Sequence, residues 1–154
     1  MDEPRWLNQD EEEAWLALVR LMFKLPTALD AQLLRDHQLT LFDYLVLSML
    51  SMAPGHTLGL SELATLVTSS PSRLSNVIKR LEQRGLVRRV PDPANARYTN
   101  ALLTGAGLDL VAAAAPGHVE AVRRYVIDSL DEDQLKALRQ LGNQVADNVD
   151  SASA

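Results

Sequence analysis

The chain has 154 residues, with 15 Lys or Arg, 20 Asp or Glu and no Cys, and 47% of its residues are apolar. This composition is typical of one ordinary globular domain, large enough to fold without disulfides or metal. The absence of Cys excludes a disulfide framework, a Cys-ligated metal site and a Cys nucleophile, and is natural in a reducing cytoplasm. Residues 1–10 are acidic rather than signal-like, and the longest apolar stretch, 39–53, is too short and too polar to span a membrane. We therefore expect a cytoplasmic protein with no membrane partner.

The charge is distributed unevenly along the chain. Residues 70–97 hold seven basic and two acidic side chains, a net charge of +5, whereas the remaining residues hold eight basic and 18 acidic side chains. The formal net charge of -5 therefore hides a compact basic segment inside an acidic protein. Such a segment is what a surface that binds a polyanion requires, although a solvated, Arg-rich helix face has the same composition.

Two helices are predicted in the first third of the chain. Residues 11–36 carry apolar side chains three and four positions apart, which predicts one long amphipathic helix. A second helix is expected from Thr40 to about Met52, because Thr40 and Asp43 have the spacing of a capping box and a Pro-Gly pair follows. Most of these apolar side chains are expected to form core.

The next segment has the pattern of a helix-turn-helix. Residues 57–60 form a short extended piece, residues 61–67 have helical spacing, and residues 68–69 make a turn. The second helix is clearly bounded, because Ser70 can cap it, Pro71 fits its first position and Gly85 provides a left-handed stop. Its apolar residues share one face, so its polar and basic residues must lie on the other.

This outward polar face is predicted to be a DNA recognition surface. A second helix that is basic outside is the one that a helix-turn-helix places in the major groove. Arg73 is the most informative residue, because a cation in the first helical turn opposes the helix dipole and a structural role does not demand it. A nearby phosphate or guanine edge would interact favourably with this cation. The predicted contacts are Ser70, Ser72, Arg73, Ser75, Asn76, Lys79 and Arg80.

A β-hairpin with a long tip is predicted after this helix. Residues 86–90 and 98–104 have strand composition, and residues 91–97 are rich in turn formers. A tip beside a recognition helix can reach the adjacent minor groove, where an Arg is attracted, and Arg97 is the candidate. Asp92 could also pair with Arg97 and stiffen the loop. The predicted wing contacts are Arg88, Arg89, Asn95 and Arg97.

The last third of the chain is predicted to form two apolar helices. Thr104 can cap the first, whose apolar spacing continues to Leu130, and a capping box near Asp131 and Gln134 begins the second. The second is expected to bury its apolar face, which consists of Leu135, Leu138, Leu141, Val145 and Val149. These helices carry more apolar surface than one subunit readily covers, unless they form an ordinary intrachain core.

The ordered set of motifs at residues 60–64, 70–75, 80–89 and 92–104 resembles the MarR family of winged-helix regulators. The resemblance covers about residues 11–149. It implies a homodimer that binds a pseudo-palindromic DNA operator, usually represses, and often releases DNA when a small, commonly aromatic or phenolic, ligand binds. It also implies that the two chain ends interlock with the partner and space the two recognition helices about one turn of DNA apart.

Some residues depart from the family pattern. Asn76 stands where the family often has Arg, Lys79 where it often has Asp, and Asn95-Ala96 where the wing tip often has an acid followed by a base. The operator sequence is therefore not transferable from the family. An Asn76 that reaches a base edge would favour adenine, although it could equally bind a phosphate. These departures also leave open a winged-helix protein that acts through protein partners with weak or no DNA binding.

A ligand pocket is implied by the resemblance, which places it between the dimer helices and the winged domain. The aromatic and histidine residues that fall on the first two helices are Trp15, Phe23, His37, Phe42 and Tyr44, although each could simply be core or surface. The predicted ligand contacts are Trp15, Phe23, His37 and Tyr44. No catalytic or metal-binding constellation is present, since His37, His56 and His118 are far apart and no phosphate loop or nucleophile elbow occurs. We expect no enzyme activity, no cofactor and no metal.

The resulting prediction is a mainly α fold within one MarR-type domain, residues 1–154. Residues 57–104 form a winged helix-turn-helix lobe with a small β-hairpin wing, and residues 11–36 and 105–149 form the dimerisation helices. The predicted function is a homodimeric, sequence-specific regulator that binds double-stranded DNA, a repressor released by a small ligand.

Overall fold

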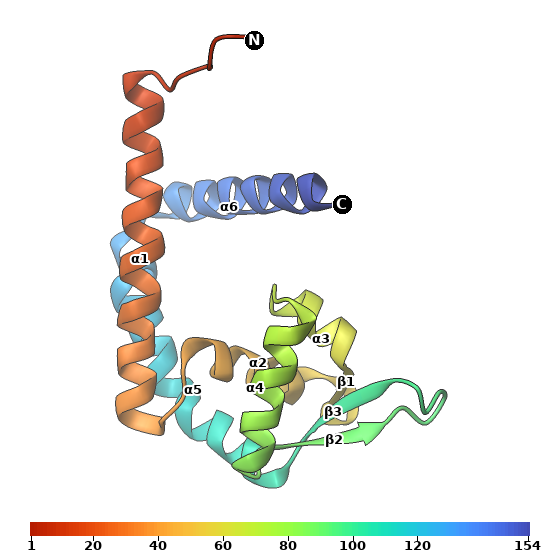
Figure 1. Ribbon diagram of the computed structural model, residues 1–154. Helices are drawn as coiled ribbons and strands as arrows, with labels where there is room; N and C mark the ends of the chain where they lie inside the picture. Colours follow the sequence, from red (N-terminus) through yellow and green to blue (C-terminus); the bar gives the residue numbers. More distant parts are fainter. The chain divides into compact units, whose positions relative to one another are not determined.

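Helices dominate the computed structural model, which describes residues 1–154 (Figure 1). The chain divides into two units, Met1–His118 and Val119–Ala154. The first contains one antiparallel sheet of three strands, in the order β1-β3-β2. The predicted mainly α fold with a small β-hairpin wing is confirmed. No helix is long and apolar enough to cross a membrane.

The first two helices begin where their capping residues predict. Helix α1 spans Gln9–His37 and starts with a capping box between Asn8 and Glu11. Helix α2 spans Leu41–Met52, and Thr40 and Asp43 form the predicted capping box. The Asp30 carboxylate on α1 also accepts the Leu41 N–H at 2.7 Å. The start of α2 is therefore fixed from two sides, because each of these oxygens satisfies a backbone N–H that the helix itself leaves free.

The helix-turn-helix consists of α3 (Leu60–Leu66) and α4 (Pro71–Gln83). The Ser70 hydroxyl accepts the N–H of Arg73 at 3.2 Å, and Pro71 occupies the first helical position. After α4, Gly85 adopts φ +74°, the left-handed conformation that glycine adopts without steric cost. Each predicted boundary signal of this helix is thus confirmed.

The sheet combines the predicted hairpin with a third strand. Strands β2 (Val87–Pro91) and β3 (Thr99–Leu103) form the hairpin, with Val87 opposite Leu103. A short 3-10 turn, η1 (Pro54–His56), leads into β1 (Thr57–Gly59), which pairs with the other edge of β3. Figure 1 shows the β2–β3 tip projecting away from α2, α3 and α4.

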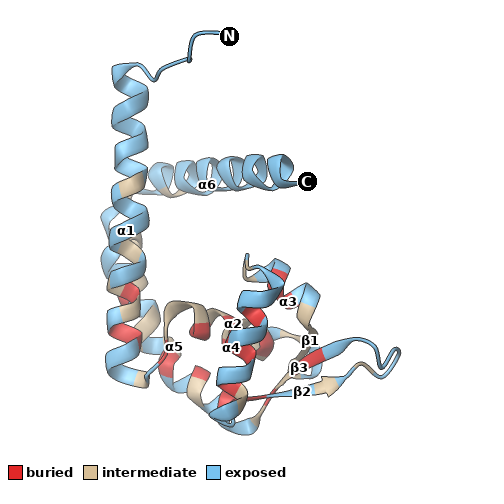
Figure 2. Cartoon of the chain, in the orientation of Figure 1, coloured by how far each residue is buried: buried red, intermediate tan, exposed pale blue.

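The core lies where α2, α3 and α4 meet the sheet (Figure 2). Helix α5 (Gly105–Tyr125) closes it, and the contact is close at its first turn, where a Cβ on Gly107 would lie 2.2 Å from the Leu86 carbonyl oxygen. Thr104 caps this helix by accepting the Gly107 N–H and donates to the Gly85 carbonyl. The fully buried side chains are Leu33, Leu39, Leu47, Leu50, Leu63, Leu74, Ile78, Leu81, Val46 and Val87.

The second unit differs from the prediction in two ways. Helix α5 ends at Tyr125 and a 3-10 turn, η2 (Ile127–Ser129), follows, so the helix does not continue to Leu130. Helix α6 (Glu132–Ser153) begins at the predicted capping box, but its apolar face is not buried. Leu135 is half-buried, whereas the other four predicted core residues, Leu138, Leu141, Val145 and Val149, are exposed. The periodicity identified the apolar face correctly, but the second unit does not itself cover this face.

Helix α1 shows a similar division. Its C-terminal part is buried at Leu29 and Leu33. Its N-terminal half is exposed (Figure 2), although it carries several apolar side chains. The exposed members of the predicted apolar stripe are Trp15, Leu18 and Met22. An amphipathic helix keeps such a stripe when its cover comes from another chain or ligand.

Candidate nucleic-acid interface

Helix α4 presents a cationic face that carries no acid. Leu74, Val77, Ile78 and Leu81 are buried. The side chains between them, from Ser72 to Arg80, are exposed and include three cations and no carboxylate. The structure therefore places the predicted recognition residues on one accessible surface, and they are Ser72, Arg73, Ser75, Asn76, Lys79 and Arg80.

Ser70 lies at the N-terminus of this helix, where it is the N-cap residue. Its oxygen caps α4 by accepting the N–H of Arg73, so this lone pair is not available to a ligand. The Ser70 hydroxyl hydrogen and the N–H of Ser72 remain as donors, because Pro71 has no N–H and the N–H groups of Arg73 and Leu74 are bonded to Ser70. Backbone donors at a helix N-terminus, together with the positive end of the helix dipole, favour a phosphate at this point.

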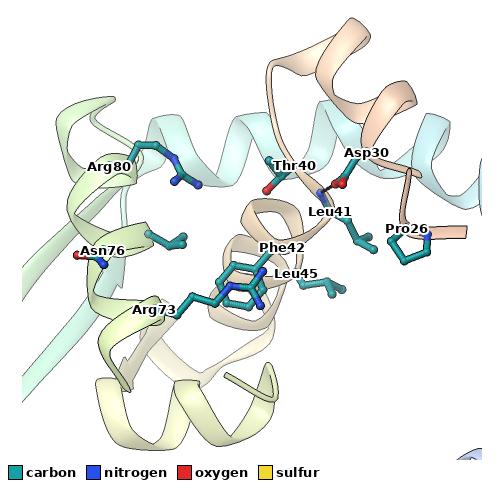
Figure 3. A pocket seen from close by; sticks show the side chains of 10 residues that line it. Pro26, Asp30, Thr40, Leu41, Phe42, Leu45, Arg73, Asn76 and Arg80 are labelled. Carbon is teal, nitrogen blue, oxygen red and sulfur yellow. Dashed lines mark hydrogen bonds between the residues drawn. The ribbon is translucent and has the colours of Figure 1, made fainter. Parts of the chain in front are cut away.

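Arg73 is held over an aromatic ring. Its guanidinium carbon lies 4.2 Å from the centre of the Phe42 ring on α2 (Figure 3). A guanidinium over a ring face is attracted by the π electrons, and the contact limits the rotamers of a long side chain. The cation that opposes the helix dipole is thus anchored by a neighbouring helix, a contact that the sequence pattern does not reveal.

Arg80 is exposed but already has an anionic partner. It forms an ion pair with Asp43, whose side chain is only 4% exposed, whereas that of Arg80 is 50% exposed. The other oxygen of Asp43 accepts the N–H of Thr40 in the capping box. Arg84, one turn further along, donates to the Gln38 carbonyl at 2.8 Å. The prediction of Arg80 as a simple DNA contact did not include this pair, which neutralises its charge.

Arg89 in the wing is also used inside the protein. Its backbone N–H and its guanidinium donate to both oxygens of Glu82, at distances of 2.9 to 3.2 Å. These bonds hold the pKa of Glu82 below its ordinary value, chiefly through the backbone N–H and then through the guanidinium. The pair fastens β2 to the end of α4. Arg88, the neighbouring residue, is exposed and in no ion pair.

The wing tip is organised by two short polar side chains. Asp92 accepts the N–H groups of Ala94 and Asn95, and the Asn95 side chain accepts the N–H of Arg97 at 3.1 Å. Asp92 therefore stabilises the turn through backbone bonds, and the ion pair between Asp92 and Arg97 that the sequence allowed does not form. The guanidinium of Arg97 projects from an ordered turn without an acidic partner, as a minor-groove contact requires.

A groove of about 500 Å³ lies between α1, α2 and α4, and we call it the α2–α4 groove (Figure 3). Its wall is mostly apolar, with one carboxylate from Asp30 and two cations from the recognition helix. A site with an apolar wall and a few polar groups has the character of a small-molecule pocket. The lining residues are Pro26, Asp30, Thr40, Leu41, Phe42, Leu45, Arg73, Asn76, Val77 and Arg80.

The four predicted ligand residues do not line this groove. Trp15 and Phe23 are exposed on the N-terminal part of α1, and His37 is half-buried at its end. Tyr44 is buried, with its ring centre 4.4 Å from that of His118. Phe42, which was considered with them on the first two helices, does line the groove. Its contact with Arg73 was not predicted, because an aromatic at the start of one helix and a cation at the start of another give no joint pattern.

Comparison with known proteins identifies the family. The MarR family model matches residues 39–99. Sco3205 from Streptomyces coelicolor, a MarR family transcriptional regulator solved in complex with DNA, is 38% identical, with a TM-score of 0.92 over 96% of this chain and 92% of Sco3205. The chain belongs to the MarR family. It is therefore a DNA-binding transcriptional regulator with a winged helix, and the family is one of regulators rather than enzymes.

Two further relatives agree. AbsC, a MarR family regulator from S. coelicolor, is 35% identical, with a TM-score of 0.91 over 96% of this chain and 99% of its own. The transcriptional regulator HosA from Escherichia coli O111:H- is 36% identical over 101 residues, which are 65% of this chain and 66% of HosA. The resemblance seen in the sequence motifs thus extends over nearly the whole fold.

Proposed function

We propose that the protein is a homodimeric repressor that binds a pseudo-palindromic operator and releases it when a small ligand binds. The observation that carries the DNA-binding part is the acid-free cationic face of α4 beside the Arg97 wing tip. In this proposal α4 lies in the major groove and the wing tip enters the adjacent minor groove. The related Sco3205 was solved in complex with DNA, which supports this placement.

The dimer is supported by the exposed apolar faces of α1 and α6. Trp15, Leu18 and Met22 on α1, and Leu141 and Val145 on α6, would be covered by the same elements of a second copy. A two-fold interface of this kind gives the protein the symmetry of a palindromic operator, with two recognition helices about 34–36 Å apart. The predicted dimerisation helices, 11–36 and 105–149, are the ones that carry these faces.

The α2–α4 groove is the proposed ligand site. A planar, aromatic anion would place its ring against Phe42 and Leu45 and its charge beside Arg73. This cation belongs to the DNA-facing helix, so the ligand would compete with DNA for it. Among more distant relatives, DNA binding by BpsR from Bordetella bronchiseptica is regulated by 6-hydroxynicotinic acid, and CouR from Rhodococcus jostii binds p-coumaroyl-CoA.

Fluorescence anisotropy with a duplex from the region upstream of the gene tests the DNA-binding part. The protein should bind this duplex orders of magnitude more tightly than a random duplex, with an affinity that falls steeply as salt rises. Arg97→Ala should weaken binding and lower the salt slope by about two, one for each subunit of the dimer. Arg5→Ala removes the same charge from an exposed residue before α1 and should change neither quantity.

Uniform binding of all duplexes, or no binding at all, would count against this duplex as the operator. If all duplexes bind alike, or none binds, the operator lies elsewhere or the protein acts through protein partners, and a genome-wide selection for bound DNA decides between these.

Repression is tested by transcription in vitro from the upstream region, where added protein should reduce the transcript. An increase would make the protein an activator.

Asn76 is the proposed base contact that distinguishes this protein within its family. It is exposed on α4 with no hydrogen-bond partner, and its side chain can pair with adenine through two bonds. Asn76→Ala should then reduce the preference for adenine at one operator position by about 1–3 kcal/mol. The base preferences at the other operator positions should not change. An equal loss of affinity for all base variants would assign Asn76 to a phosphate instead.

A further inference from the structure

The first turn of α2 contacts the recognition helix at two points. The ring of Phe42 lies against the guanidinium of Arg73, and the next residue, Asp43, forms the ion pair with Arg80. Arg73 and Arg80 are seven residues apart on α4, which places them on the same side of the helix two turns apart. Two consecutive residues of one helix therefore hold two cations of the other.

Asp43 is a fixed anchor for Arg80. One carboxylate oxygen accepts the Thr40 N–H at 3.0 Å, and the side chain is almost fully buried. The carboxylate cannot turn toward solvent without breaking the bond from the Thr40 N–H, which is one half of the capping box of α2. The Arg80 guanidinium is thus held beside Asp43, and its positive charge is balanced before DNA binds.

Phe42 plays the matching part for Arg73. This cation stands in the first turn of α4, where the helix dipole disfavours it, and no acid pairs with it. Without the ring, the guanidinium would sample many rotamers and would have to be ordered on binding. A side chain that is ordered in advance loses less freedom when it meets a base edge, which favours the one sequence that fits.

We propose that Phe42 and Asp43 are positioning residues that set the discrimination between operator and random DNA. Phe42 orients Arg73 for a base contact, and Asp43 withholds Arg80 from unspecific phosphate contacts. This inference rests on the proposed function, because it requires that α4 faces DNA. It assigns a DNA-binding role to a helix that does not itself carry the cationic face.

The test compares operator and random duplexes across salt. Phe42→Leu should lower operator affinity about 10-fold and leave random-duplex affinity and the salt slope unchanged, because Arg73 keeps its charge. Phe42→Tyr keeps the ring and should retain operator affinity. Asp43→Asn keeps the size and capping oxygen of the side chain and frees Arg80, so random-duplex affinity should rise several-fold. In the Asp43→Asn background, Arg80→Gln should abolish that rise.

Three results would overturn this proposal, and a fourth would refute the proposed function on which it rests. An equal loss on both duplexes for Phe42→Leu would indicate a purely structural role. A rise for Asp43→Asn that persists after Arg80→Gln would trace it to net charge alone. If Arg73→Ala weakens operator binding but Phe42→Leu does not, the proposed positioning role of Phe42 is wrong. If Arg73→Ala has no effect, the proposed DNA-binding face itself is wrong.

Should Phe42→Leu fail to fold, Arg73→Lys removes the contact with the ring from the other side. This variant should lose affinity for the operator but not for the random duplex.

Discussion

Replacement of Leu141 by Asp should dissociate the proposed dimer. Leu141 lies on the apolar face of α6 and is 60% exposed in the single chain. Full burial of a Leu side chain contributes about 1.5–3 kcal/mol, so covering its exposed part contributes about 1–2 kcal/mol. A two-fold dimer contains this residue twice, which gives about 2–4 kcal/mol, or about a 30- to 700-fold weaker dimer. The introduced carboxylate acts in the same direction, because it would be buried without a partner.

Sedimentation over a wide concentration range measures this dimer constant. The wild-type chain should sediment as a dimer at concentrations where Leu141→Asp is monomeric, and the variant should bind an isolated half-site as well as a full operator. Met52→Asp is the matched control, because Met52 is 69% exposed at the end of α2, in the other unit. If Leu141→Asp stays dimeric, or if both variants dissociate, the assignment of α6 to the interface is wrong.

Three further predictions concern stability. Gly107→Ala should lower the Tm by several degrees, because its Cβ would meet a backbone oxygen at 2.2 Å, whereas Gly142→Ala, with open space around it, should raise it slightly in the same thermal melt. The lowered pKa of Glu82 means that its bonds to Arg89 stabilise the fold fully above a pH of about 4.5 and lose this effect as the pH falls through the lower pKa of the folded state, so Glu82→Gln should lower the Tm more at pH 7 than at pH 3. Burial lowers the pKa of His118, so the unfolded chain binds the proton first and stability should decline below pH of about 6.5, a decline that His118→Phe should reduce.

The sequence predicts the helices of this fold well, because their ends depend on local chemistry. Thr40 and Asp43 form a capping box in the structure, Ser70 caps α4, and Gly85 takes the left-handed conformation. These signals involve residues at most three or four positions apart, so they do not depend on tertiary contacts. The pairing of β1 with β3 was not predicted, because that contact joins Thr57 to Leu102 across the whole lobe.

The burial of an apolar helix face was harder to predict than the position of the face on the helix. The apolar stripe of α6 was identified correctly, but the sequence does not say whether its cover comes from the same chain or another one. Leu138 and Val149 have the spacing of core residues and are nevertheless exposed. The same limit applies to the proposed ligand site, since the contact of Phe42 with Arg73 depends on the packing of two helices and not on either helix alone.

The cationic face itself is smaller than the sequence indicates. Of the seven basic residues in 70–97, Arg80 and Arg89 are paired with carboxylates and Arg84 donates to a carbonyl. Four cations remain for phosphates or bases in each subunit, and they are Arg73, Lys79, Arg88 and Arg97. A dimer would then neutralise about eight phosphates, which predicts a slope of about −7 in a plot of log K against log salt concentration. All seven residues would give about −13. A measured slope near the larger value would show that the internal pairs open on DNA, and that Asp43 and Glu82 do not restrain their arginines in the complex.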